Sequence, residues 1–147
     1  MTETRLSVLV VDDEIAILAL ARHFLTHHGF LVDTAENGAE CLTALETRRY
    51  DLLICDKNLP DVHGLQLLEA AKRLQPQMAR LLMTGSPEIL ALRDLELDGY
   101  LSKPWRTSTA LADAAMAAIE QHTRKGPNAT PPGRPRRDSP PKDSESA

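Results

Sequence analysis

Apolar and polar positions change their period along the first 125 residues, and the changes divide this stretch into alternating strands and helices. Short apolar runs between turn residues are typical of strands buried on both faces of a parallel sheet. Longer segments repeat apolar residues every three to four positions, which predicts amphipathic helices. We therefore predict strands over 6–11, 30–35, 52–55, 79–83 and 99–102, and helices over 14–28, 39–49, 65–74 and 107–122, with a further helix opened by Pro87.

Strands that alternate with helices in this way predict an α/β fold. Parallel strands need crossover connections, and such connections are right-handed, so we expect a doubly wound parallel sheet with helices on both faces. Residues 126–147 follow another pattern, because they are rich in Pro, Arg and Ser and hold hardly any apolar residue. Such a composition cannot repay the entropy of ordering. We predict one domain over residues 1–125 and a disordered tail over 126–147.

Composition narrows the function classes. The 147 residues include 42% hydrophobic positions, which suits one domain with a real core. The net charge is −4, and the tail holds four basic and three acidic residues, so the body is more acidic still. An acidic body argues against nonspecific binding to nucleic acid. With no charged-then-apolar leader and no long apolar run, we expect a cytoplasmic protein without membrane insertion, in which Cys41 and Cys55 are reduced core thiols.

Chemically active residues stand where the predicted strands end. They are Asp12 and Asp13, Asp56, Thr84 and Lys103. Each alone has an ordinary explanation, such as a helix cap or a surface cation. The carboxyl ends of parallel strands meet at one edge of a sheet, however, and sites form in the crevice there. Three acids, a hydroxyl and an ammonium converging on one edge favour a pocket for Mg²⁺ and a phosphoryl group.

The order of these motifs resembles the response-regulator receiver domains of two-component signalling. The matching motifs are DDE from Asp12, D-x-x-L-P-x-x-x-G from Asp56, TG from Thr84 and Y-L-x-K-P from Tyr100. Together they cover about residues 5 to 122. The resemblance implies a flavodoxin-like fold with five parallel strands in the order 2-1-3-4-5, and it extends to the single-domain chemotaxis regulators.

The resemblance also assigns the site residues. It makes Asp56 the carboxylate that takes a phosphoryl group from a histidine kinase. Asp13 and Asp56 would bind Mg²⁺ directly, Asn58 would add its backbone carbonyl, and Asp12 would act mainly through water. A carboxylate attacks a dianionic phosphoryl group poorly unless the charge repulsion is cancelled, and Mg²⁺ with Lys103 would cancel it.

Two residues form the switch that the resemblance implies. Thr84 would donate its hydroxyl to a phosphoryl oxygen, and its movement would vacate space. Tyr100, three positions before Lys103, would rotate inward to fill that space. Ordinary packing on an edge strand remains the alternative for Tyr100.

One segment departs from the family pattern. Between Thr84 and Lys103 the chain is about three residues shorter than usual, which is close to one helical turn. We therefore predict a shortened fourth helix, opened by Pro87. The target-binding surface of the family includes this helix, so we expect an altered surface here.

We expect a stand-alone response regulator that signals by phosphorylation-dependent protein binding. A sensor histidine kinase or phosphotransfer protein would act upstream, a protein target downstream, and phosphorylation could also drive a dimer. Two alternatives stay open, a phosphorelay intermediate and a scaffold whose partner binds regardless of phosphorylation. We do not expect an enzyme with an external substrate, because phosphatases of the haloacid dehalogenase type carry a second Asp where this chain has Asn58. Its own chemistry would be self-phosphorylation and autodephosphorylation.

Overall fold

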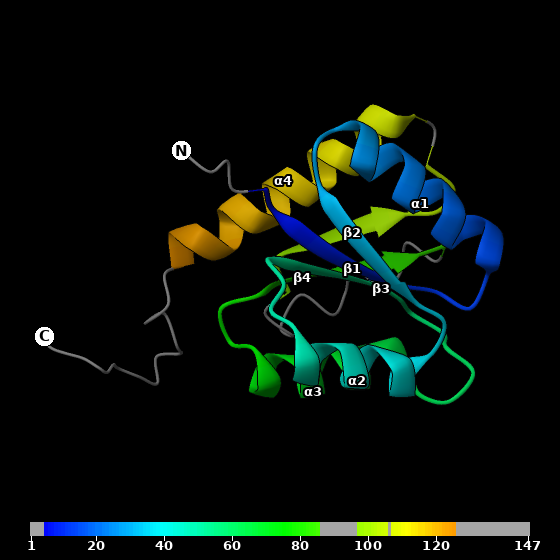
Figure 1. The fold of residues 1–147 in the computed structure, drawn as a ribbon, viewed down its shortest axis with the longest axis vertical. Coiled ribbons are helices and arrows are strands. Elements are labelled where there is room, and N and C mark those ends of the chain that lie inside the picture. Colours follow the sequence, from blue (N-terminus) through cyan, green and yellow to red (C-terminus); the bar gives the residue numbers. More distant parts are fainter. Residues whose placement is uncertain (1–4, 86–96, 106, 126–147) are drawn as a thin grey trace, which may run out of the picture.

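The structure is a computed structural model that describes residues 5–85, 97–105 and 107–125. It is a three-layered α/β fold built on one parallel sheet (Figure 1). The sheet has five strands in the order β2-β1-β3-β4-β5. This order confirms the prediction, and every strand begins and ends within one residue of its predicted bounds. The strands are β1 (Ser7–Val11), β2 (Leu31–Ala35), β3 (Leu52–Asp56), β4 (Ala79–Thr84) and β5 (Gly99–Ser102).

Helices cover both faces of the sheet. They are α1 (Ile15–His27), α2 (Gly38–Thr47), α3 (Gly64–Leu74) and α4 (Ser108–Lys125). In Figure 1, α1 and α4 lie on one face and α2 and α3 on the other, which is the doubly wound arrangement that right-handed crossovers produce. The last helix continues three residues beyond its predicted end at His122.

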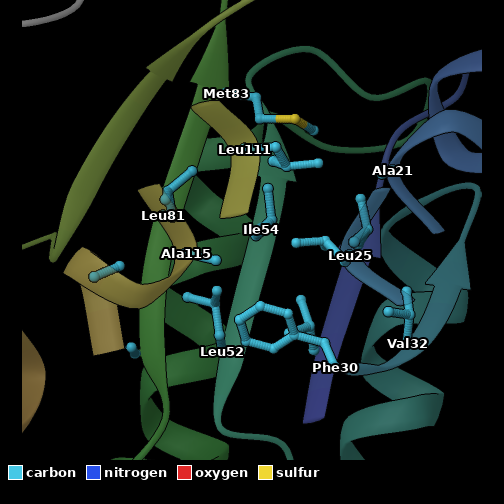
Figure 2. Packing of buried hydrophobic residues seen from close by; sticks show 14 of the residues in the cluster. Ala21, Leu25, Phe30, Val32, Leu52, Ile54, Leu81, Met83, Leu111 and Ala115 are labelled. Atoms are coloured by element: carbon cyan, nitrogen blue, oxygen red, sulfur yellow. The ribbon is translucent and has the colours of Figure 1, made fainter. Parts of the chain in front are cut away.

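Two hydrophobic clusters fill the space between the layers. Strand residues alternate between them, so Val8 and Val10 face α1 and α4 while Leu9 and Val11 face α2 and α3. Figure 2 shows the first cluster, in which Leu25 of α1 and Leu111 of α4 point toward Ile54 of the central strand. Burial on both faces explains why the strands read as continuous apolar runs.

Both cysteines are free and buried, as predicted. Burial raises the pKa of Cys41 to about 12, with a smaller contribution from the charge of Asp61. Thiols of this kind are unreactive, because the thiolate is the reactive form. Cys41 and Cys55 are therefore core residues.

Some predictions lie outside the described residues. The shortened helix opened by Pro87 falls within residues 86–96, and the predicted tail begins at residue 126. Among the described residues, no helix combines the length and the apolar character that crossing a membrane requires.

The amino ends of the strands bury polar side chains together with partners that satisfy them. The side chain of Gln75 accepts a hydrogen bond from the Tyr50 amide (3.0 Å) and donates to the carbonyls of Leu45 (2.9 Å) and Arg48 (2.7 Å). One buried amide thus joins the end of α2, the start of β3 and the end of α3. Buried polar groups are stable when they are paired in this way.

A second polar group at this end connects β4, β5 and α4. Asp98 is buried and accepts a hydrogen bond from the Arg80 amide (2.9 Å), and the Arg80 guanidinium donates to the carbonyl of Leu68 (2.8 Å). His122 places Nδ1 3.3 Å from Asp98 Oδ1 and Nε2 3.0 Å from the Pro76 carbonyl oxygen. The network fastens α4 to the amino end of the sheet.

Candidate functional site

The carboxyl ends of four strands meet at one edge of the sheet. Parallel register aligns Val11 with Cys55, Asp56 with Met83, and Thr84 with Ser102. The residues that follow β1 and β5 are therefore brought beside the last residues of β3 and β4. This is the edge at which the sequence predicts a site.

Lys103 joins the acids of two strands. Its Nζ lies 2.8 Å from Asp12 Oδ2 and 2.7 Å from Asp56 Oδ1. Asp12 is fully buried, and the side chain of Lys103 is 17% exposed. Burial alone would lower the pKa of Lys103, but hydrogen bonds to Asp12 and Asp56 and their negative charges raise it above its ordinary value. The ammonium therefore remains charged between the two carboxylates.

The acids form a compact oxygen cluster. Ligand oxygens of Asp12, Asp13 and Asp56 all lie within 4.8 Å of one another. Asp12 Oδ1 accepts a hydrogen bond from the Glu14 amide (2.9 Å). Asp13 is exposed and, among the described residues, accepts no hydrogen bond in the structure.

This cluster suits Mg²⁺ on chemical grounds. Three carboxylates face one ammonium within the described residues, so the edge holds an excess of negative charge. Mg²⁺ prefers oxygen ligands and is usually held by one or two carboxylates, with water completing its shell. The donor set therefore fits the predicted ion.

The loop after Asp56 is tightly held. Asp56 Oδ2 accepts a hydrogen bond from the Asn58 amide (3.0 Å), and the Gly64 amide donates to the Lys57 carbonyl (2.6 Å). A Cβ on Gly64 would collide with the Asp56 carbonyl oxygen and would lie 2.9 Å from Lys57 Cα. Because these are backbone atoms, only glycine allows the loop to close this near the predicted phosphoacceptor.

The predicted switch residues lie on the last two strands. Thr84 ends β4 and is buried, and its carbonyl accepts a hydrogen bond from the Lys103 amide (3.0 Å). Tyr100, in β5, lies opposite Leu82 of β4. It is partly buried and packs against the hydrophobic cluster between the sheet and helices α2 and α3. The structure thus brings Thr84 to the site edge and sets Tyr100 behind it, while their roles stay predictions.

One loop residue was not singled out from the sequence. The carboxylate of Asp61 accepts hydrogen bonds from the amides of Gly38 (2.9 Å) and Ala39 (3.0 Å) at the start of α2. In the sequence Asp61 looks like any polar loop residue, and its partners lie more than twenty positions earlier.

The family model of the response regulator receiver domain matches residues 8–116. Over 117 residues, the chain is 36% identical to the transcriptional regulatory protein GlrR of Escherichia coli K12, covering 78% of this chain and 26% of GlrR. It is 33% identical over 102 residues to the alkaline phosphatase synthesis transcriptional regulatory protein PhoP of Bacillus subtilis, covering 67% of this chain and 42% of PhoP. The chain thus spans less than half the length of these relatives.

Two solved receiver structures are similar over nearly their whole length. A CheY-like receiver domain protein from Methanospirillum hungatei aligns with a TM-score of 0.75 at 28% identity, covering 84% of this chain and all of that one. The chemotaxis response regulator CheY4 of Vibrio cholerae aligns with a TM-score of 0.71 at 31% identity, covering 78% of this chain and 99% of CheY4.

Proposed function

Because the chain belongs to the response regulator receiver domain family, we propose that Asp56 accepts a phosphoryl group from a sensor histidine kinase or a phosphotransfer protein. The observation that carries this proposal is the ammonium of Lys103, bound to both Asp12 and Asp56 at the edge where the strands end. An ammonium in contact with the phosphoacceptor cancels negative charge where more negative charge must arrive.

The residues divide the chemistry between them. A carboxylate oxygen of Asp56 attacks phosphorus, an O–P bond forms, and the N–P bond of the donor phosphohistidine breaks, so that the imidazole leaves with the electron pair. The Asn58 amide and the Lys103 ammonium hold the two oxygens of Asp56 and so orient the attack. Asp13, Asp56 and the Asn58 carbonyl would hold Mg²⁺, with Asp12 acting through water. The bound ion would supply positive charge and fix the line of approach.

We propose that the signal leaves through the last two strands. Thr84 is buried at the site edge, where its hydroxyl would donate to a phosphoryl oxygen. Tyr100 lies on the adjacent edge strand and would move inward with it. A protein partner would then read the changed surface around β5.

Phosphorylation and its hydrolysis would be the chemistry of this domain, with no external substrate. The curated relatives are longer transcriptional regulators, so what the phosphorylated domain controls is a separate proposal: we propose that it acts by binding a protein. Family membership also supports the expected cytoplasmic location.

The test is an intact mass measurement after incubation with acetyl phosphate. We expect the protein to gain one phosphoryl group with Mg²⁺ present and none when Mg²⁺ is chelated. Asp56→Asn should gain nothing, whereas Asp113→Asn, which changes an exposed acid on α4, should behave as wild type. Equal modification of Asp56→Asn, or none in a folded wild type, would contradict the proposal.

A second measurement separates the modes of signalling. Phosphorylated protein is mixed with a histidine phosphotransfer protein, and the amount of phosphoryl group on each protein is followed over time. Transfer onward would support a phosphorelay intermediate, and retention on Asp56 would support a terminal regulator. A partner bound equally by wild type and Asp56→Asn would favour the scaffold.

A further inference from the structure

The loop over residues 57–63, here called the site loop, is fastened near both ends by hydrogen bonds from backbone amides. At its start the Asn58 amide donates to Asp56 Oδ2, and at its end the Gly64 amide donates to the Lys57 carbonyl. An isolated antiparallel bridge also pairs Asn58 with His63. These contacts close the loop but do not place it relative to the helices.

Asp61 makes that placement. One carboxylate oxygen accepts from the Gly38 amide (2.9 Å) and the other from the Ala39 amide (3.0 Å). These amides open α2, where a helix favours a negative charge. The hydrogen bond from Gly38, followed by that from Ala39, lowers the pKa of Asp61 although the group is exposed. The carboxylate is therefore charged at neutral pH and binds the helix with both oxygens.

Packing supports the same contact. Gly38 is buried, and a Cβ at this position would collide with Val62 Cγ1. The site loop therefore lies directly on the first turn of α2. Leu59 and Val62 also pack against the hydrophobic cluster on this face. Pro60, between Leu59 and Asp61, has its φ fixed by its ring, which removes one backbone rotation between Asp61 and Asn58.

The start of α2 carries two separate caps. The Asn37 side chain accepts a hydrogen bond from the Glu40 amide (2.8 Å), within the helix's own first turn. Asp61 takes the two preceding amides from another element. Both caps stabilise α2. Of the two caps, Asp61 is the one that also connects α2 to the loop that leads back to Asn58.

We propose that Asp61 is a positioning residue that holds the site loop against α2 and thereby sets the place of the Asn58 carbonyl as a Mg²⁺ ligand. This inference rests on the proposed function, which makes that carbonyl a ligand. Groups that orient metal ligands without touching the ion change metal affinity when they are removed. Asp61 therefore acts on affinity for Mg²⁺ and leaves the attacking oxygens of Asp56 in place.

The experiment compares wild type with Asp61→Ala, Asp61→Asn and Asn37→Ala. Calorimetric titration measures the Kd for Mg²⁺, thermal unfolding measures stability, and phosphorylation by acetyl phosphate is followed against Mg²⁺ concentration. We expect Asp61→Ala to weaken Mg²⁺ binding about tenfold. Its phosphorylation rate at saturating Mg²⁺ should stay close to wild type. Asp61→Asn, which keeps one acceptor oxygen, should recover part of the affinity.

Asn37→Ala is the matched control, because it removes a cap from the same helix end without touching the site loop. We expect it to lower the unfolding midpoint as Asp61→Ala does while leaving the Kd for Mg²⁺ unchanged. An unchanged Kd in Asp61→Ala, or the same weakening in Asn37→Ala, would overturn the proposal. A wild type that binds Mg²⁺ but gains no phosphoryl group would refute the proposed function alone, and the Kd comparison would still decide the role of Asp61.

Discussion

The two ends of the sheet bury polar groups in opposite ways. At the amino ends, Gln75 and Asp98 have backbone and side-chain partners from the same protein. At the carboxyl ends, Asp12, Asp13 and Asp56 gather around Lys103, and negative charge remains in excess among the described residues. The first end is closed by its own hydrogen bonds, whereas the second has surplus negative charge that a bound cation would balance.

This difference separates stability from function within one fold. A closed network gains nothing from a ligand, so its residues contribute to the free energy of unfolding. An edge with surplus carboxylates is stabilised when a cation binds, because a ligand that binds only the folded state adds to stability. Substitutions at the two ends should therefore differ in whether a ligand can compensate for them.

The largest effect is expected at Lys103. Lys103→Met removes the charge that contacts Asp12 and Asp56, and we expect phosphorylation by acetyl phosphate to slow by about 100- to 1000-fold. The three acids remain, so Mg²⁺ should still raise the unfolding midpoint of this variant. Lys57→Met, which removes a lysine from the site loop, is the control and should phosphorylate normally. A rate near wild type in Lys103→Met would reduce the ammonium to a structural ion pair.

A smaller effect, on stability alone, is expected at the closed end. Gln75→Leu keeps the volume but leaves the Tyr50 amide and the carbonyls of Leu45 and Arg48 without their partner. We expect the free energy of unfolding in urea to fall by about 3 kcal/mol. Phosphorylation should be unaffected, and Mg²⁺ should restore none of the difference. Gln77→Leu, at a nearby exposed position, should change little; a similar loss in both variants would show that the hydrogen bonds of Gln75 are not the cause.

The smallest effect is the response of the site edge to alkaline pH. The pKa of Lys103 is raised in the folded protein, so its contribution to stability is complete below the unfolded pKa of about 10.4 and is lost as pH rises through the folded value. The gap in unfolding free energy between wild type and Lys103→Met, without Mg²⁺, should narrow over that range.

Other groups also titrate in alkali, but they do not affect this comparison. Burial, with the hydrogen bond to Asp33, raises the pKa of Tyr50, and burial raises that of Cys41. The contributions of Tyr50 and Cys41 to stability fall with rising pH, and they are the same in wild type and in Lys103→Met. A gap that stays constant into strong alkali would mean that the charge of Lys103 does not stabilise the fold.

The fold and the central site could be predicted because both depend on features that the sequence records locally. Apolar runs indicate where the strands lie, and parallel strands in the order that the family resemblance implies bring Asp12, Asp56 and Lys103 to one edge. The register places Thr84 at the same edge for the same reason. Parallel topology thus turns positions far apart in the sequence into neighbours.

Contacts made by single polar side chains between elements could not be predicted in this way. Asp61 caps a helix that precedes it by more than twenty positions, and His122 reaches the Pro76 carbonyl 46 positions away. Gln75 looks like an ordinary polar residue at a helix end. Their partners are backbone groups, which every residue carries, so no pattern of side chains marks them.

The separation of Lys103 from its partners bears on how the protein is made. Lys103 is 91 positions from Asp12 and 47 from Asp56, and it follows the last strand. Domains fold while the ribosome is still adding residues. On the proposed function, a nascent chain that has completed β3 carries its acids but still lacks the ammonium that would balance the arriving phosphoryl group. Copies that end before Lys103 would therefore accept phosphoryl groups far more slowly than finished molecules.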